Sequence, residues 1–259
     1  MGLPARVEIV PGGDVVAQVR RHLAPGTTVT ITCLPHHGPE ETVQLAGELA
    51  ALGYRAVPHL AARTIASRHQ LTEFAARLGD AGVRDVFVIA GDSRETAGPY
   101  AWSLPLLEDL AEIGGFDVGF AAYPEGHPTI AEPELTELLL RKQEFGSWAV
   151  TQMCFSGEVL TDYVGRLRAD GVTVPVWGGV PGRVRRTRLL ALAGRIGVGP
   201  SLKFAQRSGS LLRSVLAPSS YDPSPLVRSV EKSGGFAGLH VYSFNDFGRG
   251  NPPVSRPSR

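Results

Sequence analysis

The stretch RAVPHLAARTIASRHQLTEFAARLGDAGVRDVFVIAGD, residues 55–92, places a strand, a helix and a second strand in immediate succession. The apolar runs 55–60 and 85–90 are short and contain the valine, isoleucine and aromatic residues typical of strands buried on both faces. Residues 67–82 between them have a helical period, with Ser67 as the expected cap and Gly82 at the end. This unit predicts an α/β fold built on a parallel sheet.

The same alternation extends over most of the chain. Strand-like runs occur at 7–10, 28–33, 55–60, 85–90, 117–122, 148–153, 173–178 and 238–244. Helices are expected at 39–53, 67–82, 133–146, 157–171 and 184–197, and two or more between 200 and 235. Eight such strands predict a single-domain (β/α)8 TIM barrel over residues 1–247, with a doubly wound open sheet as the alternative. Residues 248–259 are expected to form a flexible tail.

The composition limits the classes of partner. The 259 residues include 26 basic and 25 acidic side chains, so the net charge of +1 predicts no nucleic-acid partner and no anionic membrane surface. No long apolar stretch predicts a membrane span or a signal peptide, which favours a cytoplasmic protein. Cys33 and Cys154 lie in apolar runs and are expected to be buried, reduced thiols. No cysteine and histidine spacing predicts a metal site.

Polar and titratable residues follow the expected strands. In a TIM barrel the reactive groups gather at the carboxyl ends of the strands, so these residues are the candidates for a functional site. They are Glu8, Thr32, His59, Asp92, Tyr123, Glu125, His127, Gln152, Tyr242, Asn245 and Asp246.

Each candidate also has a structural interpretation. Glu8 could face water on an edge strand, but inside a barrel it must be paired or hold a proton. His59 could be a core histidine, and Asp92 an ordinary turn residue. Gln152 is the least expected of the set, because an amide inside a strand needs several hydrogen bonds.

Six motifs occur in one order along the chain. They are VEIVP at 7–11, VPHLAAR at 57–63, VIAGD at 88–92, AAYPEGHP at 121–128, RKQEFG at 141–146 and VTQMCF at 150–155. Together they resemble the methylenetetrahydrofolate reductase family over about residues 7–246. The YPEGHP motif and the pairing of a lysine with a later TQ are the specific parts of this resemblance.

The resemblance implies a barrel that holds FAD at the ends of its strands. NADH or NADPH reduces the flavin, which then passes hydride to 5,10-methylenetetrahydrofolate and forms 5-methyltetrahydrofolate in ping-pong fashion. The implied partner is therefore a folate substrate, a tetrahydrofolate derivative of one-carbon metabolism and methionine biosynthesis. The choice between NADH and NADPH and the existence of a homo-oligomer are left open.

The resemblance also implies roles for single residues. Glu8 matches the family's general acid, which helps to open the folate ring to an iminium ion. Asp92 matches the carboxylate that stabilises this cation and contacts the substrate, and Gln152 matches the glutamine that binds the pterin. The flavin-contacting positions of the family correspond here to Thr32, His59, Gly91, Tyr123, His127 and Lys142.

Departures from the family pattern concentrate on the flavin side. The family's LRGD is IAGD here, so Ala90 stands where an arginine meets the phosphate side of the flavin. The strand-two end is TCLPHHG rather than the common TYG. Two alternatives therefore remain open: a flavin-independent reductase of the same substrate that uses NADH directly, and a folate-binding or one-carbon transfer protein without reductase activity.

Overall fold

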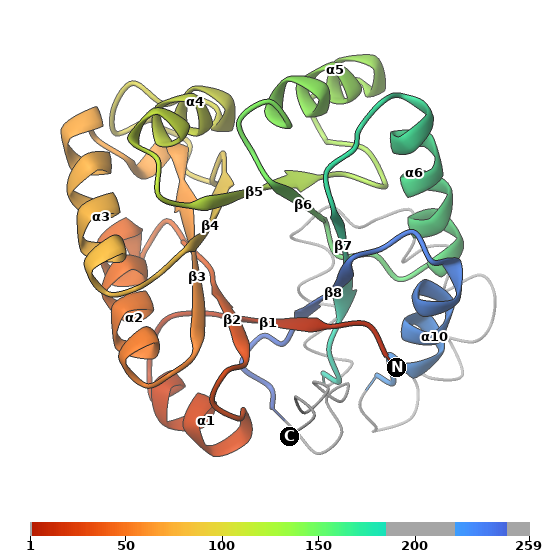
Figure 1. The fold of residues 1–259 in the computed structure, drawn as a ribbon, viewed down its shortest axis with the longest axis horizontal. Coiled ribbons are helices and arrows are strands. Elements are labelled where there is room, and N and C mark those ends of the chain that lie inside the picture. The colour runs from red at the N-terminus through yellow and green to blue at the C-terminus, as the bar shows by residue number, and fades with distance from the viewer. Residues whose placement is uncertain (1, 185–220, 248–259) are drawn as a thin grey trace.

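A computed structural model describes residues 2–184 and 221–247 and shows a closed barrel of eight parallel strands (Figure 1). Each strand pairs with its neighbours in chain order, and β1 pairs with β8 to close the ring. The strands are β1 (Ala5–Ile9), β2 (Thr28–Ile31), β3 (Arg55–Ala61), β4 (Asp85–Ile89), β5 (Asp117–Ala122), β6 (Trp148–Thr151), β7 (Val176–Pro181) and β8 (Gly238–Tyr242). The predicted TIM barrel is confirmed, and the open sheet is wrong.

Strand β7 lies three residues later than predicted, at Val176–Pro181 instead of 173–178. The backbone N–H of Thr173 donates to the side chain of Gln143, 2.9 Å away, and so does not enter the sheet. Pro175 has no N–H to donate, and only its carbonyl accepts a hydrogen bond, from Ala149 of β6. The strand therefore begins after the proline.

Helices surround the barrel on its outside (Figure 1). In the described residues they are α1 (Val15–His22), α2 (Gly38–Ala51), α3 (Arg68–Asp80), α4 (Ser103–Ile113), α5 (Glu132–Lys142), α6 (Gly157–Ala169) and α10 (Ser224–Ser233), with a 3-10 turn η1 (Ala62–Thr64). The predicted Ser67 cap is confirmed, since its hydroxyl accepts the N–H of Gln70 at 3.1 Å.

Helices α1 and α4 were not expected from the sequence. Helix α1 has only eight residues and buries only Val15 and Val19, too few to show a clear period. Helix α4 contains Pro105, which usually interrupts a helix but lies here in the first turn, where the missing N–H would have no helical partner. The predicted helix 184–197 beyond residue 184, the stretch 200–220 and the tail 248–259 lie outside the described residues.

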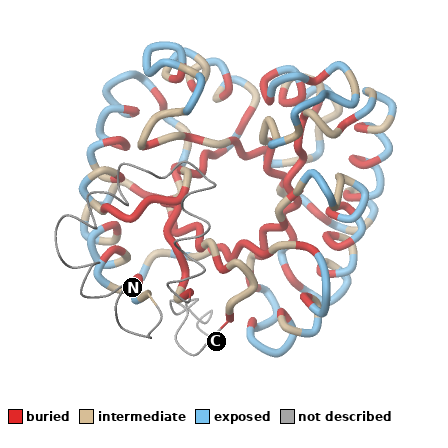
Figure 2. Tube along the Cα trace, turned by 180° about the vertical axis from the view of Figure 1, so that it is seen from behind, coloured by how far each residue is buried: buried red, intermediate tan, exposed pale blue. Residues whose placement is uncertain are grey.

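Side chains of the strands alternate between the barrel interior and the helix layer. Figure 2 shows the strands as a nearly continuous buried ring inside a half-exposed layer of helices. In β1, Val7 and Ile9 pack into the apolar core between strands and helices. Arg6 and Glu8 alternate with them and face the interior, where charged side chains must find partners.

The amino-terminal end of the barrel is filled by one cation between two indole rings. The guanidinium of Arg6 lies 3.9 Å from the ring centre of Trp148 and 3.8 Å from that of Trp177. Burial lowers the pKa of Arg6 to about 10, so it stays charged at neutral pH. Gly119 and Gly238 make room for the indoles, because a Cβ at either position would lie 2.2 Å from a ring carbon.

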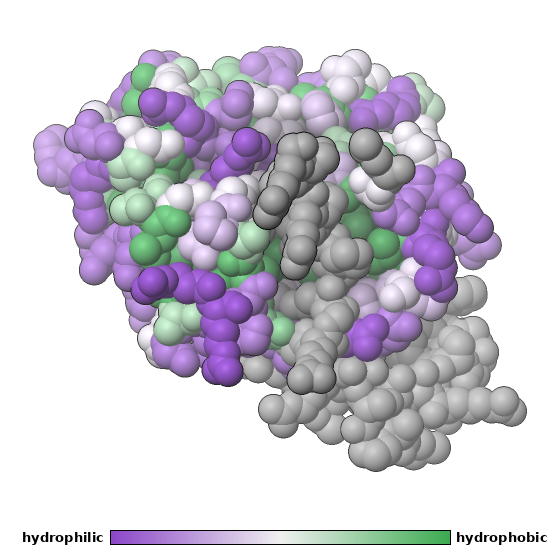
Figure 3. Space-filling model, turned by 60° about the horizontal axis from the view of Figure 1, so that its bottom comes forward, coloured by the Kyte–Doolittle hydropathy of each residue, from purple (hydrophilic) through white to green (hydrophobic). Residues whose placement is uncertain are grey.

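The two cysteines are buried, and the surface seen in Figure 3 is mostly hydrophilic. Cys33 and Cys154 are free and buried, as predicted. In the view of Figure 3, hydrophilic residues surround smaller apolar areas. Among the described residues, the large apolar side chains that are exposed are Leu52 and Trp102. No helix in the described part of the chain is long and apolar enough to cross a membrane. No cluster of described histidine, cysteine and carboxylate side chains could hold a metal ion.

Candidate active site

Glu8 lies inside the barrel and contacts histidines from two other strands. Its Oε2 atom is 2.9 Å from Nε2 of His240 on β8 and 3.7 Å from Nε2 of His59 on β3. The Glu8 side chain is 11% exposed, and those of the histidines 1% and 6%. The carboxyl group is thus paired and largely removed from water, so Glu8 is not an edge residue.

His59 is the neutral member of this group. Burial lowers its pKa to about 4, the nearby Glu8 opposes this shift, and His240 adds to it. Its ring packs against Phe87 of β4, with 4.8 Å between the ring centres. Its Nε2 has no hydrogen-bond partner among the described residues. His59 therefore offers an uncharged, unpaired polar atom to the barrel interior.

The end of β4 makes a sharp turn at Gly91, whose φ is +86°. A Cβ at this position would also lie 3.0 Å from the Cβ of Ala61 on the neighbouring strand. Glycine is therefore needed both for the backbone conformation and for the close approach of β3. The turn leaves the next residue, Asp92, exposed at the carboxyl end of the barrel.

The segment after β5 forms a stiff turn that presents two rings. The rings of Tyr123 and His127 meet edge to face at 4.9 Å, and the N–H of Gly126 donates to the carbonyl of Tyr123 at 3.1 Å. The N–H of Tyr123 is held by the hydroxyl of Tyr163 from α6, also at 3.1 Å. Pro124 and Pro128 belong to the turn and restrict the backbone that carries the two rings.

Lys142, at the end of α5, is a buried cation without a described counter-ion. It is 8% exposed, and no described carboxylate oxygen lies within 4.0 Å of its ammonium group. Burial alone lowers its pKa to about 8. Burial also lowers the pKa of His127, and the charges of Lys142 and Arg63 lower it further. These cations therefore act on the same space beside the turn, which favours an anionic ligand.

Thr32 and Gln152 lie where β2 and β6 end. The N–H of Thr32 extends the sheet to Ile9 at 3.0 Å, and its buried hydroxyl has no partner among the described residues. The N–H of Gln152 donates to the carbonyl of Ala122 at 2.7 Å, which fixes its backbone beside β5. Both side chains belong to the end of the barrel at which Asp92 and Tyr123 are found.

Tyr242 of β8 lies near Glu8 and Tyr123 and contacts the end of β6. Its hydroxyl donates to the carbonyl of Thr151, the residue before Gln152, at 3.1 Å. Burial raises its pKa well above the usual value, and the neighbouring Glu8 and then Tyr123 add to this. Burial likewise raises the pKa of Tyr123, and Asp92 adds to it. Glu8 lies near the carboxyl end of β1, and Asp92 and Gln152 follow β4 and β6; that the three form one site stays a prediction.

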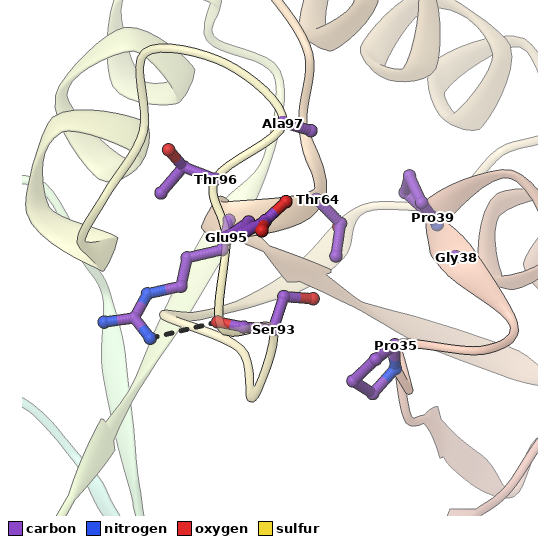
Figure 4. A pocket seen from close by; sticks show the side chains of 9 residues that line it. Pro35, Gly38, Pro39, Thr64, Ser93, Glu95, Thr96 and Ala97 are labelled. Carbon is purple, nitrogen blue, oxygen red and sulfur yellow. Dashed lines mark hydrogen bonds between the residues drawn. The ribbon is translucent and has the colours of Figure 1, made fainter.

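A cavity of about 370 Å³ opens at the same end of the barrel (Figure 4). Pro35 and Pro39 lie on one side of it and Ser93 and Thr96 on the other. Its volume is within the range of small-molecule sites. The predicted site residues do not line it, but Ser93 directly follows Asp92, so the cavity adjoins the group described above.

Sequence reasoning missed His240, and the structure gives Asn245 a structural contact. His240 stands two residues before Tyr242, so the strand period puts both in the barrel interior and could have identified it. Asn245, expected near the site, ties the barrel closed: its amide donates to the carbonyl of Val10 at 2.8 Å and accepts the N–H of Val10 at 2.9 Å.

Comparisons with known proteins identify the family. A family model described as methylenetetrahydrofolate reductase matches residues 16–182, a range that contains Asp92 and Gln152 but neither Glu8 nor His240. The 5,10-methylenetetrahydrofolate reductases of Pectobacterium carotovorum subsp. carotovorum and Salmonella typhimurium are 34% and 30% identical over 131 residues, 49% of this chain. The chain spans 44% of the length of each of these relatives.

Two solved structures share the fold at low sequence identity. One is an uncharacterized protein from Clostridium thermocellum that binds two copies of 5-methyl-5,6,7,8-tetrahydrofolic acid, with a TM-score of 0.60, 12% identity, and coverage of 93% of this chain and 88% of that one. The other is oxaloacetate acetylhydrolase, with a TM-score of 0.55, 10% identity, and coverage of 92% and 75%. At these identities the similarity shows the barrel architecture.

Proposed function

This chain belongs to the methylenetetrahydrofolate reductase family, and on that premise we propose that it reduces 5,10-methylenetetrahydrofolate to 5-methyltetrahydrofolate with NADH or NADPH. The observation that most supports the proposal is the buried carboxyl group of Glu8 inside a barrel whose carboxyl end presents Asp92 and Gln152. Opening the five-membered folate ring needs a proton donor at a place that excludes bulk water, and Glu8 is 8% exposed.

The proposed roles follow from charge. Glu8 gives a proton to the ring nitrogen that leaves, and the carbon between the two nitrogens becomes part of an iminium cation. Asp92, a carboxylate at the carboxyl end of the barrel, stabilises that cation until hydride reaches it. Gln152, which can both donate and accept hydrogen bonds, binds the polar edge of the pterin. These roles stay proposals for the three residues.

The residues at the barrel end fit a flavin nucleotide. Lys142 is a buried cation with no described counter-ion, as a site for a phosphate group requires. The unpaired polar atoms of Thr32 and His59 can serve the polar edge of a flavin ring, and Gly91 allows close approach of the backbone. Tyr123 and His127 present a rigid pair of rings beside Lys142. FAD, when bound, would take hydride from the nicotinamide and pass it to the folate.

One observation favours direct hydride transfer from NADH without flavin. Ala90 leaves the end of β4 without the guanidinium that the family's LRGD motif provides. The features that suit a flavin nucleotide at Lys142, Tyr123 and His127 also suit the phosphates and rings of NADH. The bound cofactor and the kinetic pattern distinguish these two routes.

A folate-binding protein without reductase activity is the alternative from another class. The Clostridium thermocellum protein that shares the barrel fold binds a methylated tetrahydrofolate, which supports a folate ligand whichever chemistry follows. A cytoplasmic location, a homo-oligomer and a place in methionine biosynthesis stay predictions.

An absorption spectrum of the purified protein, before and after addition of FAD, tests the cofactor. Flavin absorbance that stays with the protein supports the FAD route, and initial-rate kinetics should then show a ping-pong pattern. A colourless protein that turns over with ternary-complex kinetics in flavin-free buffer supports direct transfer. Folate binding without NADH or NADPH oxidation in either buffer would leave a binding protein and refute the reductase.

A further inference from the structure

We propose that His240 decides which oxygen of Glu8 carries the acid proton: Nε2–H of His240 donates to Oε2, and the proton of the acid resides on Oε1. This inference rests on the proposed role of Glu8 as the proton donor. His240 is then a positioning residue, because it acts on the folate only through Glu8.

The two oxygens of Glu8 have different surroundings. Oε2 lies 2.9 Å from Nε2 of His240, with Nε2 of His59 at 3.7 Å from the same oxygen. Oε1 receives no hydrogen bond from the described residues. It is nevertheless absent from the unpaired atoms that are fully buried, so part of its surface is accessible. The residual 11% exposure of the Glu8 side chain is thus available to Oε1, which makes it the oxygen that can reach a ligand.

The surroundings of His240 decide its tautomer. Its Nδ1 is buried and has no partner among the described residues. A hydrogen on Nδ1 would therefore be a buried, unsatisfied donor, at a cost of about 1–3 kcal/mol. A hydrogen on Nε2 instead has an acceptor in Oε2 of Glu8. Nδ1 lacks a partner in either tautomer, and buried N–H groups without a partner are rarer in proteins than buried acceptors without one, so we infer hydrogen on Nε2.

The proton, the broken bond and its electron pair are all accounted for in this proton transfer. The proton leaves Oε1 for the departing ring nitrogen of the folate, the carbon–nitrogen bond breaks, and its electron pair stays on that nitrogen. His240 keeps its hydrogen throughout, and its bond to Oε2 strengthens as the carboxylate becomes charged. His59 is neutral at this pH and Tyr242 holds its proton, so neither competes for the proton that Glu8 releases.

The tautomer can be measured on the unliganded protein. Long-range ¹H–¹⁵N spectra at pH 7, with the His240 signals assigned by their loss in His240→Gln, should show hydrogen on Nε2 and a bare Nδ1. Hydrogen on Nδ1 alone would mean that Glu8 donates to His240 from Oε2, and would overturn the proposal. A doubly protonated ring would mean that Glu8 is ionised at rest, and would overturn it as well.

Two substitutions test the positioning role in turnover. The amide of His240→Gln can still donate near the Nε2 position, whereas His240→Leu cannot. We expect the folate half-reaction to fall by about tenfold or more in the leucine variant and to stay within about threefold in the glutamine variant. Binding of NADH should change in neither, and His69→Leu, at a histidine that is 83% exposed, is the matched control.

The outcomes separate this inference from the proposed function. A glutamine variant as slow as the leucine variant, with both folded, would refute hydrogen-bond donation by His240. A wild-type protein that never oxidises NADH or NADPH would refute the reductase, while the tautomer measurement would still decide the arrangement of Glu8 and His240.

Discussion

Nε2 of His240 and Oε2 of Glu8 lie 2.9 Å apart, although 232 positions separate the two residues in the chain. The contact exists because β8 pairs with β1 and closes the barrel. The last strand thus supplies the partner of the carboxyl group on the first strand. Chemistry at Glu8 therefore depends on barrel closure, which couples the proposed acid to the folding of the whole domain.

Glu8→Gln should abolish most folate reduction and spare nucleotide binding. The amide has nearly the shape of the acid but no proton to give, so we expect a loss of about a hundredfold or more in the folate half-reaction. Stopped-flow measurement of the folate half-reaction, beside a titration with NADH, checks this. Equal losses in both would instead indicate that Glu8 holds the barrel together.

Asp92→Asn should slow the folate half-reaction by about tenfold, because a neutral amide stabilises an iminium cation poorly. Asp92 is exposed, so water weakens its charge and a larger loss is not expected. The same rapid-mixing assay measures the effect, with Asp80→Asn, at an exposed carboxylate where α3 ends, as control. An unchanged rate would remove Asp92 from the mechanism.

Lys142→Met should stabilise the ligand-free protein. The pKa of Lys142 falls from 10.5 to about 8, which corresponds to a cost of about 3 kcal/mol for keeping the charge buried at neutral pH. Between pH 8 and 10.5 the unfolded chain binds a proton that the folded chain does not, so this destabilisation fades as the pH rises. Urea unfolding at pH 7 and pH 10 should show the gain at pH 7 and little at pH 10. Lys232→Met, at an exposed lysine, should show neither effect.

The same lysine should make nucleotide binding depend on pH. We expect ADP to bind wild-type protein about tenfold more weakly once the pH passes well above 8, where the unliganded ammonium loses its proton. Lys142→Met should bind weakly at every pH, and Lys142→Arg should stay charged and lose the pH dependence. Calorimetric titrations at pH 6.5 and 9.5 measure this; equal affinity of wild type and Lys142→Met would show that Lys142 meets no phosphate.

Gly119→Ala should destabilise the barrel by about 3 kcal/mol. The new Cβ would lie 2.2 Å from a ring carbon of Trp148, whose indole packs against Arg6 and has little freedom to move. Gly165→Ala is the matched control, because nothing lies within 4 Å of a Cβ in that helix and alanine should gain about 1 kcal/mol. Denaturant midpoints compare the two; a Gly119→Ala protein as stable as wild type would contradict the close packing.

The sequence predicted the barrel because its strands are short apolar runs between helical periods, and it predicted the candidate site because titratable residues follow those runs. It missed α1 because Val15 and Val19 alone give no period. It missed His240 although the strand period places it in the barrel interior; its pairing with Glu8 also needs the register of β1 with β8, which no local pattern gives. The shift of β7 arose from the contact of Thr173 with Gln143, again between distant residues.

The stack of Arg6 between Trp148 and Trp177 has a consequence for proton traffic. It fills the amino-terminal end of the barrel with packed side chains on the other side of Glu8. If Glu8 donates its proton in each turnover, a new proton would have to reach it from the carboxyl end of the barrel, where folate would also bind and leave. Glu8 would then be reprotonated only after product leaves, and slow product release would keep Glu8 deprotonated.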